Sequence, residues 1–149
     1  MSKQPVDLLR LFSYNENKIK KLYLLYARDF PEHRKDWENI AAEEKEHAAA
    51  LRELSEQFCA KDSFTRVSPY GYSILNYAKH FLDCQIKLVQ KHKITSRQAL
   101  NTAIRLELSL VERRTFDIFT PASDDIAKVL SRLNRETEEH AKRLRKLLN

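Results

Sequence analysis

Five ionisable residues interrupt apolar patterns that are otherwise typical of buried helix faces. Each stands three, four or seven positions from apolar residues on its own helix face, and the five are Glu16, Glu44, His47, Glu107 and His140. Glu44 and His47 are three positions apart, so both side chains lie on one face of a helix. Burying an isolated carboxylate costs several kcal/mol, and three of the five residues are carboxylates. The pattern therefore requires something that neutralises them.

Two divalent metal ions would provide that neutralisation. Three carboxylates and two imidazoles that converge from four helices can ligate two ions in the core of a bundle. The carboxylate of Glu44 can bridge both ions while the neighbouring imidazole of His47 binds one of them. The sequence therefore predicts a dinuclear metal site built from these five residues.

The composition indicates which elements position the site. The chain has 149 residues with one glycine and four prolines, and 32% of its residues are charged. So few turn-forming residues exclude a sandwich or barrel of many short strands, and one glycine excludes a glycine-rich phosphate loop. We expect an all-α fold with a single domain over residues 1–149.

Apolar spacing and breaking residues predict four long helices, with a shorter helix in the long connection between the second and the third. The long helices are expected at Pro5–Asp29, Pro31–Phe58, Thr95 or Ser96 to Phe119, and Ser123 or Asp124 to Leu148, and the short one at Ser73–Lys91. The segment between Cys59 and Tyr72 is expected to be a loop with a turn at Pro69–Gly71.

Cysteine usage and charge bear on compartment and partners. Cys59 and Cys84 are isolated cysteines without a C-x-x-C pair, so we expect neither disulfides nor a rubredoxin-type iron site. No segment approaches the roughly 20 apolar residues of a membrane span, and the N-terminus has no apolar signal core. The formal net charge of +6 is spread along the chain without aromatic interleaving. We expect a cytoplasmic protein that uses neither a membrane nor nucleic acid.

The spacing of these residues resembles a known family. The pattern Glu16…Tyr23…Ala27…Phe30-Pro31, followed by Trp37…Ile40-Ala41…EKEH, resembles the first half of ferritin-like di-iron proteins of the rubrerythrin group. The stretch ITSRQALNTAIRLE, which ends at Glu107, and EEHAKRL around His140 are similar to the third and fourth helices of that group. The resemblance covers nearly the whole chain and implies a ferritin-like four-helix bundle.

The resemblance also implies roles for the five residues. Glu16 and His47 would bind one iron, Glu107 and His140 the other, and Glu44 would bridge the two. Two irons are expected, one iron is an alternative, and manganese or zinc stay open. The implied activity is reduction of a small oxidant, peroxide or dioxygen; hydroxylation of an organic substrate is not separable from it by sequence. A homodimer rests on the resemblance alone.

Three departures from the family pattern stand out. Position 137 is threonine where the family has the glutamate of its second Glu-x-x-His, which removes one bridging carboxylate; Glu136 is the nearest substitute. Leu110 replaces an extra glutamate that rubrerythrins use in peroxide chemistry. No rubredoxin domain follows Asn149, so electrons are expected to come from another protein.

The competing interpretation is a helical bundle that has lost full metal binding and acts as a structural or interaction module. Its buried carboxylates would then be protonated, hydrated or paired with Arg105 or Arg114. Tyr23 is interpreted as core packing beside the site. The other histidines, His33, His80 and His92, are expected on the surface.

Overall fold

The computed structural model describes residues 5–57, 64–108 and 118–149. The helices in these ranges are α1 (Pro5–Asp29), α2 (Arg34–Gln57), α3 (Gly71–Gln90), α4 (Ser96–Leu106) and α6 (Asp124–Leu147). A 3-10 turn at Pro31–His33 precedes α2, and two short strands, β1 (Phe64–Val67) and β2 (Phe119–Pro121), pair antiparallel. The expected all-α class is confirmed.

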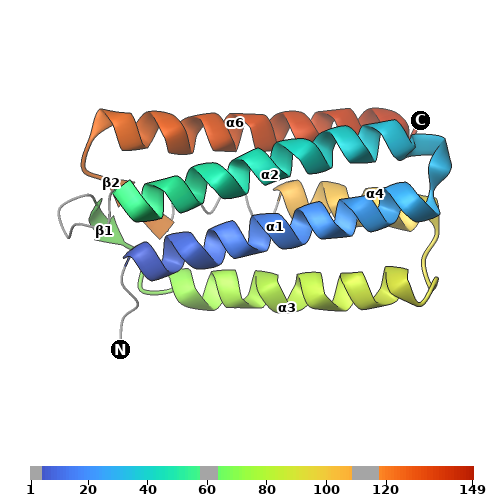
Figure 1. Cartoon of the computed structure of the whole chain (residues 1–149), viewed down its shortest axis with the longest axis horizontal. Coiled ribbons are helices and arrows are strands. Elements are labelled where there is room, and N and C mark those ends of the chain that lie inside the picture. The colour runs from blue at the N-terminus through green and yellow to red at the C-terminus, as the bar shows by residue number, and fades with distance from the viewer. Residues whose placement is uncertain (1–4, 58–63, 109–117) are drawn as a thin grey trace.

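The long helices lie side by side along the long axis of the molecule (Figure 1). Helices α1 and α2 form an antiparallel hairpin and make the most extensive contact in the molecule, and α3 packs on the other side of α1. Helix α6 lies along α2 and also contacts α4. This arrangement surrounds one core with helical faces that come from distant parts of the chain.

The helix ends follow from local sequence. Proline disfavours α conformation in the residue before it, and α1 ends at Asp29, directly before Phe30-Pro31. Helix α4 begins with a capping box: the Thr95 side chain accepts from the amide of Gln98, and the Gln98 side chain accepts in return from the amide of Thr95. Ser123 caps α6 through the amide of Ile126.

Helix α3 has 20 residues and is shorter than α1, α2 and α6, and its ends lie within two positions of those expected. Two predictions about the connections are wrong. The expected loop contains strand β1, whose partner β2 is more than fifty positions away. Phe119 lies in β2 and not at the end of a helix, and residues 109–117 of the expected third long helix lie outside the described residues. The pairing of two short strands that are distant in the sequence leaves no local periodicity to detect.

The core beside the site is aromatic. The ring of Trp37 lies 5.3 Å from that of Tyr23 and 5.0 Å from that of Tyr26, measured between centroids, and all three side chains are fully buried. Aromatic pairs at these separations add to the stabilisation from buried area. The α1–α2 hairpin is therefore fixed next to the positions that carry Glu16 and Glu44.

Candidate metal centre

All five residues of the predicted site point into the same part of the core. Glu16 comes from α1, Glu44 and His47 from α2, Glu107 from the C-terminal cap of α4, and His140 from α6. Each of them is at most 2% exposed. At Glu107 the chain widens into a short π-helical turn, a feature often found at functional sites. The periodicity argument thus located five buried ionisable side chains.

Glu44 lies at the centre of the cluster. Its Oε1 is 2.7 Å from Nδ1 of His140, and its Oε2 is 3.3 Å from Nδ1 of His47. Nδ1 of His140 is also 3.7 Å from Oε2 of Glu107, and Glu16 shares a hydrogen bond with Glu44. The two imidazole rings are stacked with centroids 5.3 Å apart. Each oxygen of Glu44 therefore faces a different imidazole.

One atom on each of these residues is buried and has no hydrogen-bond partner among the described residues. These atoms are Oε2 of Glu16, Oε1 of Glu44, Nδ1 of His47, Oε2 of Glu107 and Nδ1 of His140. Buried polar atoms in native proteins are nearly always paired, so five exceptions in one cluster need a cause. Around a metal ion, the lone pairs of several ligand atoms are directed at one point. The ligand atoms then lie close to one another, but without the angles that hydrogen bonds require.

The contacts of Glu44 with the two imidazoles, at 2.7 and 3.3 Å, are near the separation of two atoms that ligate one ion. Two ligand atoms that are each about 2.1 Å from one ion lie about 3.0 to 3.4 Å apart for octahedral to tetrahedral angles. Glu44, His47 and His140 can each offer one atom such that all three lie within 4.8 Å of one another. Two imidazoles and one carboxylate are a ligand set used by non-haem iron. The inner cluster is therefore a candidate metal centre.

The outer nitrogens of both imidazoles contact carboxylates from the opposite helix. Nε2 of His47 on α2 is 2.8 Å from Glu136 on α6, and Nε2 of His140 on α6 is 2.9 Å from Glu43 on α2. Arg143 donates to the same Glu43 oxygen at 2.7 Å. A carboxylate behind a ligating imidazole fixes its tautomer and its orientation. Both rings are thus held with Nδ1 directed at Glu44.

Tyr23 connects the aromatic core to the cluster. Its hydroxyl donates to Oε1 of Glu107 at 2.7 Å, which leaves Oε2 of that carboxylate directed toward His140. The predicted packing role of Tyr23 is confirmed by its contact with Trp37. Its hydrogen bond to Glu107 is an additional role that sequence reasoning missed.

Burial and mutual contact shift the pKa values of the cluster. Burial, together with repulsion from Glu44, raises the pKa of Glu16 well above its ordinary value and that of Glu107 to about 7. Burial acts the same way on Glu44, but contacts with Glu16 and the two histidines lower its pKa well below the ordinary value. Burial opposes protonation of His140, yet Glu107 and Glu44 raise its pKa to about 11. Without metal, these shifts favour an ionised Glu44 next to the protonated forms of Glu16 and His140.

The departures from the family pattern have defined places. Thr137 is buried, and its hydroxyl donates to the backbone carbonyl one turn earlier at 2.8 Å, so it adds no ligand. Glu136 is 44% exposed and binds the outer nitrogen of His47, so it does not replace the missing inner carboxylate. Arg105 is exposed, so its suggested pairing with the buried carboxylates is wrong. Leu110 and Arg114 lie outside the described residues.

The outer carboxylates could have been found in the sequence. Glu43 precedes His47 by four positions, and Glu136 precedes His140 by four, so the same spacing occurs in both histidine helices. The sequence argument used only the spacing of three and missed Glu43. The remaining histidines, His33, His80 and His92, are not buried, as predicted.

Comparisons of the chain with protein-family models, curated proteins and solved structures find no match. Among the described helices, none has the length and apolar character that crossing a membrane requires. The function of the chain is therefore inferred from the cluster.

Proposed function

We propose that this chain is a ferritin-like four-helix metal protein whose carboxylate–histidine centre binds iron and serves the reduction of a small oxidant, peroxide or dioxygen. In this proposal Glu44 bridges two ions, Glu16 and His47 complete one position, and Glu107 and His140 complete the other. The distances of 2.7 and 3.3 Å from the two Glu44 oxygens to different imidazoles support a bridging role.

The observation that carries the proposal is the set of five buried atoms, one on each of the five residues, without hydrogen-bond partners among the described residues. A core selected for stability alone is better served by apolar side chains of the same volume. Keeping three carboxylates and two imidazoles there is costly without a cation, and a divalent ion removes that cost while using the unpaired atoms.

The ligand types suit iron and fit the proposed chemistry. Imidazole and carboxylate donors suit iron, manganese and zinc, and bound iron would supply the one-electron steps that oxidant reduction needs. The chain's own residues hold the carboxylates in place, since Tyr23 hydrogen-bonds Glu107, and they shield the centre from solvent. In this proposal the electrons come from another protein.

Metal content after anaerobic addition of ferrous iron tests the proposal directly. Protein purified without a chelator or a metal affinity column is expected to hold one to about two irons per chain, and the ferrous protein is expected to consume peroxide. Intact helical circular dichroism with no bound iron would contradict the proposal.

A matched pair of variants separates the cluster from histidine in general. His140→Gln removes one inner ligand and is expected to lower the iron content and peroxide consumption. His92→Gln changes an exposed histidine whose side chain contacts Asp29 and lies outside the cluster, and it is expected to bind iron like the parent protein. Equal loss in both variants would show that the iron binds elsewhere.

The alternative is a structural or interaction module, and one observation favours it. In the metal-free cluster the raised pKa values of Glu16 and His140 let protons neutralise the ionised Glu44. Under this alternative a chelator leaves the melting temperature unchanged, whereas removal of a metal bound only by the folded state lowers it.

A further inference from the structure

A groove between α2 and α6 connects the surface with the cluster. It contains a pocket of about 340 Å³ whose lining includes His47, Glu46, Glu53, Arg132 and Glu136. His47 connects this pocket with the cluster: its Nε2 contacts Glu136, which also lines the pocket, at 2.8 Å, and its Nδ1 lies 3.3 Å from Oε2 of Glu44. The pocket therefore ends at an inner ligand of the candidate metal centre.

The charge of this pocket is opposite to that of the chain. Three carboxylates line it, and Arg132 is the one cation among its described lining residues, while the chain as a whole has a net charge of +6. A second pocket of about 300 Å³ shares Glu53 and Arg132 and adds Asp125. A cleft lined by one sign of charge concentrates ions of the other sign.

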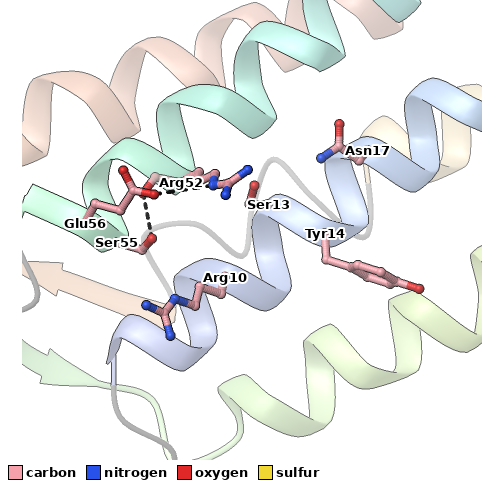
Figure 2. A pocket seen from close by; sticks show the side chains of 7 residues that line it. All are labelled: Arg10, Ser13, Tyr14, Asn17, Arg52, Ser55 and Glu56. Atoms are coloured by element: carbon pink, nitrogen blue, oxygen red, sulfur yellow. Dashed lines mark hydrogen bonds and ion pairs between the residues drawn. The ribbon is translucent and has the colours of Figure 1, made fainter.

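A further groove among the described residues differs both in charge and in the absence of cluster residues along its lining. Figure 2 shows the pocket of about 390 Å³ between α1 and α2, where Arg10 and Arg52 lie with the single carboxylate of Glu56. Glu56 pairs with Arg52 at 3.4 Å. None of the five cluster residues is among the described residues that line it. This pocket therefore provides a built-in comparison.

The two outer carboxylates are also held unequally. On the His140 side, Glu43 is fixed by Arg143 at 2.7 Å. On the His47 side, the nearest guanidinium to Glu136 among the described ion pairs is Arg132, at 4.0 Å. Glu136 is therefore the less restrained of the two and stands in the acidic pocket, where His47 holds it at 2.8 Å but no guanidinium holds it closely.

We infer that the α2–α6 groove is the route by which a divalent metal ion reaches the buried cluster. Glu46 and Glu53 attract the ion, and Glu136 passes it to His47 at the floor of the pocket. The inference rests on the proposed function, since it needs a cluster that binds metal. Beyond the proposed function, the inference states from which side of the molecule the ion enters and which residues set the rate of metal loading.

Loading of the metal-free protein with Co²⁺, followed by stopped-flow absorbance, tests this route. At low ionic strength, removing one carboxylate about 6 Å from the path of a divalent ion is expected to slow loading about three- to tenfold. Glu53→Gln is expected to show this decrease, and Arg132→Gln an increase of similar size. Added salt is expected to reduce both differences. Glu56→Gln, on the α1–α2 groove, is the matched control and is expected to load at the parent rate.

The outcomes separate the route from the proposed function. Equal Co²⁺ content at equilibrium with altered rates in Glu53→Gln and Arg132→Gln supports the route. Equal content with parent rates in both variants, or the same slowing in Glu56→Gln, overturns the route and leaves the metal centre standing. A parent protein that is folded but binds no Co²⁺ and no ferrous iron overturns the proposed function, and the route fails with it.

Discussion

Metal binding is expected to release protons from the cluster, in a number that depends on which residues become ligands. A ligating imidazole nitrogen and a ligating carboxylate must both be unprotonated. Burial opposes the charge on His140, but Glu107 and Glu44 raise its pKa to about 11, so at pH 7 it has to give up one proton. The contact with Glu44 outweighs burial at His47 and raises its pKa above the ordinary 6.5, so it contributes part of a second proton.

The carboxylates add to this number only if they become ligands. The pKa of Glu107 is raised to about 7 by burial and by Glu44, so at pH 7 this residue holds about half a proton. The pKa of Glu16 is raised well above its ordinary value for the same reasons, so it adds up to one more. An ion bound by Glu44, His47 and His140 alone should release one to about two protons, and a site of all five residues up to about one and a half more.

Isothermal titration calorimetry in buffers of different ionisation enthalpy measures this number. The observed binding enthalpy changes linearly with the buffer's ionisation enthalpy, and the magnitude of the slope is the number of protons released. The exposed-site variant His92→Gln should give the parent slope, and His140→Gln a slope lower by about one. A parent slope near zero with clear metal binding would refute the reasoning, because the ion would then be bound by groups that hold no protons at pH 7.

Three further predictions concern stability and stoichiometry. A metal ion at about a hundred times its Kd should stabilise the parent protein by about 2.7 kcal/mol and raise Tm by roughly 5 to 11 °C, whereas Glu44→Gln should show no metal-dependent shift in calorimetric melting; an equal shift would contradict the central role of Glu44. Thr137→Glu should raise the iron content toward two per chain while destabilising the metal-free protein, because it buries another carboxylate; unchanged metal content would count against it. The stability of the metal-free protein to urea should fall from pH 7 to 11. The reason is that His140 has a pKa of about 11 in the folded chain and one near 6.5 in the unfolded chain, so only the folded chain holds this proton in that range; a stability that does not change with pH would contradict that pKa.

The buried cluster was predictable because polar interruptions of an apolar stripe are a local signal. Glu16 and Glu107 are separated by more than ninety positions, yet each could be assigned to a buried face from its own helix alone. The helix starts at Ser96 and Asp124 were predictable for the same reason, because capping is a contact between residues three positions apart.

The features that sequence reasoning missed depend on which helices become neighbours. Strand β1 has no partner until β2 is brought to it. The outer contacts between Glu136 and His47 and between Glu43 and His140 connect α2 with α6. A spacing of four positions indicates that such a carboxylate shares a face with a histidine, but not which histidine it contacts.

The two histidine helices carry matching segments, Glu43-Glu44-x-x-His47 and Glu136-Thr137-x-x-His140, and they differ at the inner position. The outer carboxylates are kept in both helices, while the inner carboxylate is present in one and replaced by threonine in the other. Charge then limits the number of ions, because a low-dielectric core favours neutrality. One divalent ion is neutralised by Glu44 and Glu107 while Glu16 stays protonated, whereas two divalent ions exceed three ionised carboxylates by one positive charge. We therefore expect the first ion to bind more tightly than the second, and a glutamate at position 137 to remove that difference.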